Sequence, residues 1–211
     1  MAGVRNKVSA VVSTQWLSEH LTKPNVRVLD GSWHLPNQNR DPRKEYKEAH
    51  IPGSLFFDID GCSRPSNYAH MLPGEEQFEN YVGQELGIGN DTHVVVYDNN
   101  DMWGLLSAQR VWWTFRVFGH NLVSVVEGGL PSWIKEKRPV TQEVPTVIPQ
   151  VFKAKFQAHL VKSYEDLEKN MKEKKIQIVD ARPEGRFKGK APEPREGGSL
   201  YLYRYLLLLR M

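Results

Sequence analysis

The feature that most constrains the fold is a repeated order of short apolar runs and amphipathic helices. The clearest run is Val94-Val95-Val96-Tyr97, which ends in Asp98 and precedes a polar loop and a predicted helix over residues 107–118. A continuous apolar run is typical of a strand buried on both faces of a parallel sheet. The same reasoning predicts strands at residues 11–12, 26–30, 55–57, 123–126 and 176–180, and helices at 14–20, 43–49, 75–86, 133–136 and 163–174. The sequence therefore predicts an α/β protein whose parallel sheet is flanked by helices.

The order of strands and helices is interrupted once and then begins again. Residues 141–150 hold two prolines and few large side chains, which is the composition of a linker. Val28-Leu29-Asp30 and Ile178-Val179-Asp180 each follow a capped helix, and this weak internal repeat indicates two copies of one unit. We expect a first domain at residues 9–140, a linker at 141–158, the start of a second domain at 159–198, and a divergent Leu/Tyr-rich tail at 199–211. On this interpretation the second domain is cut short.

Composition excludes several classes of function. The 28 Lys and Arg against 25 Asp and Glu give a net charge of +3, and no basic cluster is interleaved with stacking aromatics, so no nucleic-acid partner is expected. No stretch approaches the ~18 apolar residues of a membrane span. One cysteine, Cys62, cannot form an internal disulfide, which favours a reducing compartment. Because residues 1–13 are basic and free of acids, a mitochondrial location is expected as readily as a cytoplasmic one.

The turn after residues 94–97 is the strongest candidate for an anion or thiolate site. A strand-to-helix turn directs backbone N–H groups to one point beside a helix N-terminus. The residue there is Asp98, which cannot perform thiol chemistry, and no second ligand is spaced to hold a metal, so we expect this loop to be catalytically silent. Cys62 lies in a polar Gly-Cys-Ser-Arg stretch that favours exposure, but no such turn is placed to lower its pKa. We do not expect it to act as a nucleophile.

Several ordered motifs carry a family resemblance. They include His50-Ile51-Pro52-Gly53-Ser54, His70-Met71-Leu72-Pro73-Gly74, Arg110-Val111-Trp112-Trp113, Glu127-Gly128-Gly129-Leu130 and Gly185-Arg186-Phe187. Over about residues 9 to 197 the chain resembles the rhodanese family of sulfurtransferases. The resemblance implies tandem rhodanese-like α/β domains, of which the first is inactive and carries Asp where the second carries a nucleophilic cysteine. Asp98 fits that inactive first copy.

Within the family, Asp60, His70 and Arg195 favour the 3-mercaptopyruvate branch over the thiosulfate branch. The resemblance implies that Arg186 and Arg195 bind the substrate carboxylate and keto group, and that Asp60 and His70 support the cysteine. Guanidinium forks suit a planar carboxylate, and a histidine oriented by a carboxylate can move a proton at neutral pH. Purely structural roles for these residues stay open. Each arginine could be an exposed loop residue, His70 could cap or bridge a loop, and Asp60 could be a structural turn acid.

The implied activity is sulfur transfer from 3-mercaptopyruvate or thiosulfate, through a cysteine persulfide, to a thiol acceptor such as thioredoxin. It needs neither cofactor nor metal. The 211 residues lack the cysteine loop, and covalent sulfur transfer needs a thiolate, so we expect this chain to be inactive. Two alternatives are a binding or regulatory module that partners full-length sulfurtransferase, and an unstable truncated product.

Overall fold

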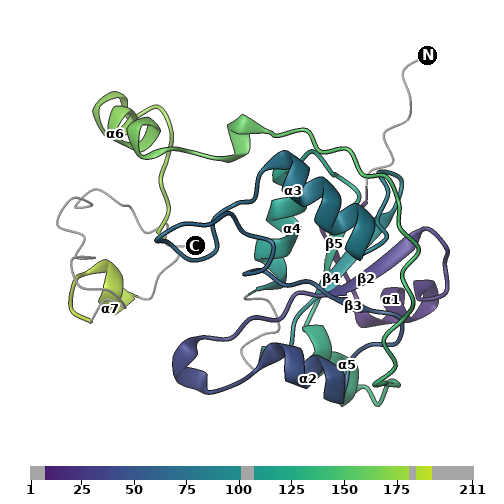
Figure 1. The fold of residues 1–211 in the computed structure, drawn as a ribbon. Helices are drawn as coiled ribbons and strands as arrows, with labels where there is room; N and C mark the ends of the chain where they lie inside the picture. The colour runs from purple at the N-terminus through teal and green to yellow at the C-terminus, as the bar shows by residue number, and fades with distance from the viewer. Residues whose placement is uncertain (1–7, 101–106, 181–183, 192–211) are drawn as a thin grey trace. The chain divides into compact units, whose positions relative to one another are not determined.

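The computed structural model describes residues 8–100, 107–180 and 184–191, and the chain divides into two compact units, Met1–Val161 and Lys162–Met211 (Figure 1). The first unit holds one five-stranded sheet. Its strands are β1 (Val11–Val12), β2 (Val26–Asp30), β3 (Leu55–Phe56), β4 (His93–Tyr97) and β5 (Val123–Val126). They are all parallel, in the order β1-β5-β4-β2-β3, and Val96 pairs with Leu29 on one side and Val125 on the other. The predicted parallel α/β fold is confirmed.

The described part of the first unit holds five α-helices, of which the first two begin at a residue whose side chain caps the helix. They are α1 (Thr14–His20), α2 (Pro42–Glu48), α3 (Glu75–Asn80), α4 (Ala108–Val117) and α5 (Gly129–Lys135), with a 3₁₀ turn at Pro36–Gln38 and a π-helical turn at Tyr81–Glu85. The Ser13 hydroxyl accepts a hydrogen bond from the Trp16 N–H at the start of α1. Asp41 caps α2, and Pro42 follows it at a position where no N–H is needed.

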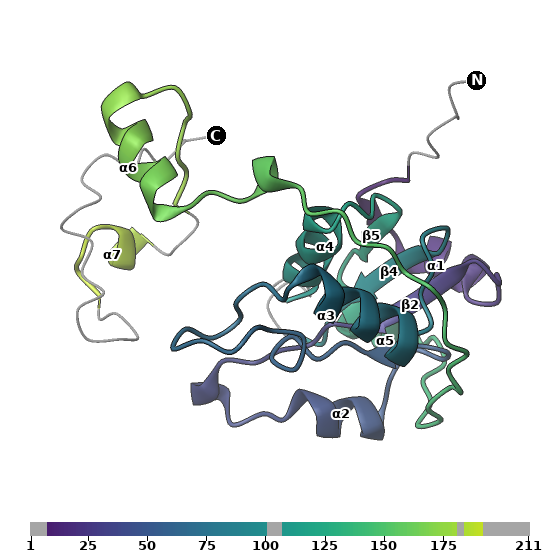
Figure 2. The same ribbon diagram turned by 45° about the horizontal axis from the view of Figure 1, so that its top comes forward.

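Successive residues of β4 face opposite sides of the sheet, and each side is buried. Val94 and Val96 belong to a core shared with α3 and α4, whereas Val95 and Tyr97 belong to a second core shared with α1 and α5. Figure 2 shows these helices around the sheet. All four side chains are fully buried. Since burying one such side chain stabilises a fold by about 1.5–3 kcal/mol, covering both faces explains why the run Val94 to Tyr97 contains no charged residue.

Residues 141–157, which we call the strap, run extended along the first unit. Thr141 and His50 exchange backbone hydrogen bonds of 2.9 Å, and Gln150 N donates to Gly83 O at 2.9 Å. A Cβ at Gly83 would lie 2.6 Å from the carbonyl oxygen of Gln150, so the close approach requires glycine. Phe152 is 2% exposed and belongs to the α3/α4 core. The segment that we expected to be a linker is therefore also a packed part of the first unit.

Two expected elements differ from the structure. Helix α5 begins at Gly129, four residues before the predicted start, because Gly128 at φ +72° turns the chain directly into the helix. The strand predicted at residues 176–180 is wrong. These residues form no strand, and Ile176 and Val179 are 55% and 56% exposed. A parallel strand needs a neighbouring backbone, and the described part of Lys162–Met211 offers none.

The regular structure described in the second unit is helical. It contains α6 (Tyr164–Glu173) and α7 (Glu184–Phe187), and a 3₁₀ turn, Ala158–Leu160, comes just before it in the chain. Helix α6 starts with a reciprocal capping box, in which Ser163 and Asp166 each accept the other's backbone N–H. Among all the helices described, none has the length and apolar character to cross a membrane.

Candidate functional site

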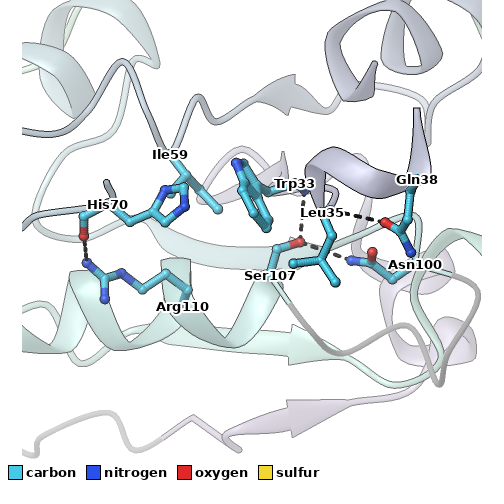
Figure 3. Close-up of a pocket in the computed structure, with 8 residues that line it drawn as sticks. All are labelled: Trp33, Leu35, Gln38, Ile59, His70, Asn100, Ser107 and Arg110. Atoms are coloured by element: carbon cyan, nitrogen blue, oxygen red, sulfur yellow. Dashed lines mark hydrogen bonds between the residues drawn. The ribbon is translucent and has the colours of Figure 1, made fainter. Parts of the chain in front are cut away.

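A cavity of about 340 Å³ lies beyond the carboxyl ends of β2 and β4 (Figure 3). From β2 the chain continues to β3 on one side of the sheet, and from β4 it continues to β5 on the other. Ligand sites of open α/β sheets form at such a divergence. The cavity is lined by Trp33, Leu35, Gln38, Ile59, His70, Asn100, Ser107 and Arg110.

Asp98 does not face this cavity as a reactive group. It is fully buried, and its Oδ2 accepts hydrogen bonds from the N–H groups of Ser107 at 2.8 Å and Ala108 at 2.9 Å. These are the first N–H groups of α4, where the helix dipole favours negative charge. The anion position at this helix N-terminus is thus filled by the chain's own carboxylate. The catalytic silence of the loop stays a prediction.

Behind the cavity, short polar side chains join the ends of β2 and β4. Ser32 Oγ donates to Asp30 Oδ1 at 2.5 Å and accepts from Asn99 N at 2.8 Å. Ser107 Oγ accepts from Trp33 N at 3.1 Å, so each serine links the two loops. Complete burial raises the pKa of Asp30 to about 6, and the charge of nearby Asp98 adds to the effect. This network fixes the loops from which the cavity is built.

Glu45 is the centre of a second group of contacts beside the network. Arg40 binds it with two parallel hydrogen bonds of 2.7 Å, and His34 Nε2 lies 3.0 Å from its Oε2. Partial burial alone would raise the pKa of Glu45, but the hydrogen bonds from Arg40 and His34 outweigh burial and lower it. Since Arg40 also donates to Asn99 O at 3.0 Å, the ion pair holds the loop after β4.

Asp60 and His70, which we predicted as a pair, lie together, and His70 lines the cavity. The His70 Nδ1 atom is buried and lies 2.7 Å from Asp60 Oδ1, at an ion-pair distance outside hydrogen-bond geometry. The His70 side chain is 30% exposed and the Asp60 side chain is 58% exposed. The contact sets a carboxylate beside the imidazole that lines the cavity, but the support of a cysteine by these two residues stays a prediction.

Sequence reasoning missed two residues at the cavity wall. Trp33 Nε1 donates to Asp60 Oδ2 at 3.0 Å, and its ring meets the His70 ring edge-on at 4.6 Å between centroids. Arg110 donates to the His70 carbonyl oxygen, as Figure 3 shows. Arg110 stood in the Arg-Val-Trp-Trp motif, so the motif was visible although the contact was not.

The two predicted substrate arginines belong to the other unit. Arg186 lies in the four-residue helix α7 and is partly exposed, with interactions of its own. Arg195 lies outside the described residues. Their assignment to a substrate carboxylate stays a prediction.

Cys62 corrects an expectation. It is 4% exposed, not exposed as its polar neighbours suggested, because the turn Asp58 to Cys62 directs the thiol into the α3/α4 core. Burial raises the pKa of Cys62 to about 12, and the nearby Glu85 and Asp58 add to the effect. The thiol is therefore protonated at physiological pH, and a protonated thiol is a poor nucleophile. The described residues also contain no group of three His, Cys, Asp or Glu placed to hold a metal.

Comparison with known proteins agrees with this geometry. The family model described as Rhodanese-like domain matches residues 13–136, which is more than half of the chain. The chain belongs to the rhodanese-like family. The matched residues contain strands β2 to β5, the cavity wall and Asp98, so the resemblance seen in the sequence is confirmed.

Relatives of this rhodanese-like chain are named for two sulfur donors. Human 3-mercaptopyruvate sulfurtransferase is 48% identical over 193 residues, covering 89% of this chain and 64% of the relative. Rat thiosulfate sulfurtransferase is 51% identical over 190 residues, covering 88% and 63%. The crystal structure of SseA from Escherichia coli, described as a 3-mercaptopyruvate sulfotransferase, matches with a TM-score of 0.80 at 35% identity, covering 90% of this chain and 72% of SseA. The chain thus spans just under two thirds of the length of these two curated relatives.

Proposed function

We propose that this chain supplies the non-catalytic rhodanese-like part of a sulfurtransferase and does not turn over substrate by itself. The whole reaction would move sulfur from 3-mercaptopyruvate or thiosulfate to a thiol acceptor through a cysteine persulfide. The names of the relatives support this reaction class. We further propose that Asp60 and His70 serve proton transfer there, and that Arg186 and Arg195 bind the donor's carboxylate.

One observation carries the proposed inactivity: the strand-to-helix turn suited to a thiolate holds a buried carboxylate. Asp98 accepts the N–H groups at the start of α4 that would otherwise stabilise a nucleophilic sulfur. The one cysteine of the 211 residues, Cys62, is buried in the core with a raised pKa. A persulfide needs a thiolate that the donor can reach, and neither position provides one.

The test is sulfide release from 3-mercaptopyruvate by the purified chain, with dithiothreitol as the thiol acceptor. A full-length 3-mercaptopyruvate sulfurtransferase serves as the positive control, and thiosulfate replaces the donor in a parallel series. We expect no release above the reductant blank. Release that is abolished by Cys62→Ser would mean that Cys62 is the nucleophile, and the proposal would fail.

A binding or regulatory role is a second candidate, and the completeness of the first unit favours it. The sheet is buried on both faces, and the strap closes its α3/α4 core. Such a unit can be stable as a partner of a full-length sulfurtransferase or of thioredoxin. Co-purification of tagged chain with either protein would support this role, and a clean monomer in the presence of both would oppose it.

A further inference from the structure

Arg110 is partly buried, and its charge contacts groups of a different kind from those that Arg40 and Arg138 contact. Arg40 and Arg138 each contact a carboxylate within hydrogen-bond distance. In the described part of the chain Arg110 forms no such ion pair; its guanidinium donates to the His70 carbonyl oxygen and lies 4.8 Å from the Trp113 ring centroid. Moving a cation out of water onto a neutral carbonyl costs free energy. Such a contact calls for a role in the fold or the site.

The residue that Arg110 holds has an unusual backbone. His70 has φ +59°, in the left-handed region that costs a residue with a side chain roughly 1–2 kcal/mol. Such conformations persist only where the surroundings enforce them, and they concentrate at functional sites. The hydrogen bond from Arg110 fixes the carbonyl of this strained residue, and so it also fixes the direction in which the imidazole leaves the backbone.

The His70 ring is held from two further directions. Trp33 meets it edge-on at 82° between ring planes, and the same indole donates its N–H to Asp60. Asp60 in turn places a carboxylate oxygen 2.7 Å from His70 Nδ1. Although this contact lies outside hydrogen-bond geometry, a carboxylate oxygen at that distance disfavours a bare nitrogen and favours an N–H electrostatically. In the neutral ring the proton is therefore favoured on Nδ1 and the lone pair on Nε2.

We propose that Arg110 and Trp33 are positioning residues that hold the His70 imidazole against Asp60 in its Nδ1-protonated form at the cavity wall. Arg110 acts through the His70 backbone, and Trp33 acts through the Asp60 carboxylate. The imidazole then presents one defined acceptor nitrogen, Nε2, for a donor group such as a thiol. Only this last use rests on the proposed sulfur-transfer function. The positioning of the imidazole is independent of that function.

The experiment reads the protonation site of His70 directly. Two-bond ¹H–¹⁵N correlation spectra of the full chain, labelled with ¹⁵N-histidine, separate the two tautomers of each neutral ring, and His70→Gln assigns the signal. The parent chain should show the Nδ1–H form of His70 as the majority. Arg110→Met should make it the minority form, whereas Arg110→Lys, which keeps one donor for the carbonyl, should retain it in part.

A matched control is available on the same helix. Arg116 is also partly exposed, also lies on α4 and also stacks on a tryptophan, with its Cζ 5.3 Å from the Trp112 ring centroid, but it does not line the cavity. Arg116→Met should therefore leave the His70 tautomer unchanged. A shift of equal size in this control would mean that any loss of a cation from α4 disturbs the ring, and the proposal would fall.

Other outcomes also decide the matter. A parent chain whose His70 is mainly the Nε2–H form overturns the proposal without any variant, and so does a folded Arg110→Met with an unchanged tautomer. If Arg110→Met fails to fold, Trp33→Phe keeps an aromatic ring beside His70 and removes the donor to Asp60 together with the second ring of the indole. Loss of the Nδ1–H majority in that variant supports the proposal, and its retention overturns it. Because no sulfur chemistry is measured, failure here is separate from failure of the proposed function.

Discussion

Phe152 should be one of the most important residues for the stability of the first unit, although it lies in a segment with the composition of a linker. Its side chain is 2% exposed, and its ring centroid lies 5.6 Å from that of Phe78, 6.5 Å from that of Phe115 and 5.5 Å from that of His120. Truncating a buried Phe to Ala costs about 3–5 kcal/mol, as transfer energy plus the cavity left behind. Against a total stability of ~5–15 kcal/mol for a typical domain, Phe152→Ala should remove a large share.

Urea unfolding followed by tryptophan fluorescence measures this loss in the relevant unit, because all six tryptophans lie within residues 1–161. With a slope of about 2 kcal/mol per molar urea, the midpoint should fall by about 2 M. Val151→Ala is the matched control, since Val151 is the preceding strap residue and is 71% exposed. It should change stability by no more than ~0.5 kcal/mol. If Phe152→Ala cost less than about 1 kcal/mol relative to this control, the strap would not be part of the core.

Three further predictions follow from buried groups. Asp98→Ala leaves the first N–H groups of α4 without their acceptor and should lower the free energy of unfolding by about 2–4 kcal/mol in the same urea assay; a loss under about 1 kcal/mol would refute the capping role. Burial raises the pKa of Asp30 to about 6 and lowers the pKa of His93 to about 4. Between pH 4 and 6 the folded chain keeps a proton on Asp30 that the unfolded chain loses, so Asp30 lowers the free energy of unfolding as pH rises, by up to about 1.4 kcal/mol per pH unit. His93 has the opposite effect. Its ring binds a proton in the unfolded chain but not in the folded chain, so it raises the free energy of unfolding as pH rises over the same range. Asp30→Asn should therefore make stability rise more steeply with pH from 4 to 6 than in the parent, and parallel curves would contradict this. Finally, Ellman's reagent at pH 8 should modify Cys62 at least ~100-fold more slowly in the native chain than in urea, since burial raises the pKa of that thiol to about 12; equal rates would show an exposed thiol.

The parts of the fold that the sequence predicted are those where one physical cause dominates. A strand such as β4 is buried on both faces, so its apolar run marks it, and Ser13 marks the start of α1 because a cap is a local contact. Residues 176–180 show the limit of that reasoning. The run Ile-Gln-Ile-Val has strand propensity, but a strand forms only if another backbone pairs with it. Propensity cannot report whether that partner exists.

The candidate site was predictable only in part for a related reason. Asp60 and His70 stood in recognisable motifs, and the structure brings them together. The contacts of Trp33 and Arg110 depend on how the loops after β2 and β3 meet helix α4, which residue type does not encode. Likewise, the neighbours of Cys62 are polar, but a single tight turn rotates that one side chain inward. Local sequence composition averages over such differences between adjacent residues.

The strand order has a consequence for how the chain is made. β1 pairs with β5, so Val11 meets Val125 only after most of the first unit has left the ribosome. At a synthesis rate of about 5–20 residues per second, the earliest strand waits roughly 6–23 seconds for its partner. During that time the central pair β2 and β4 can form first, and the sheet grows outward from its middle. The N-terminal strand, although translated first, is then among the last pieces to join the sheet.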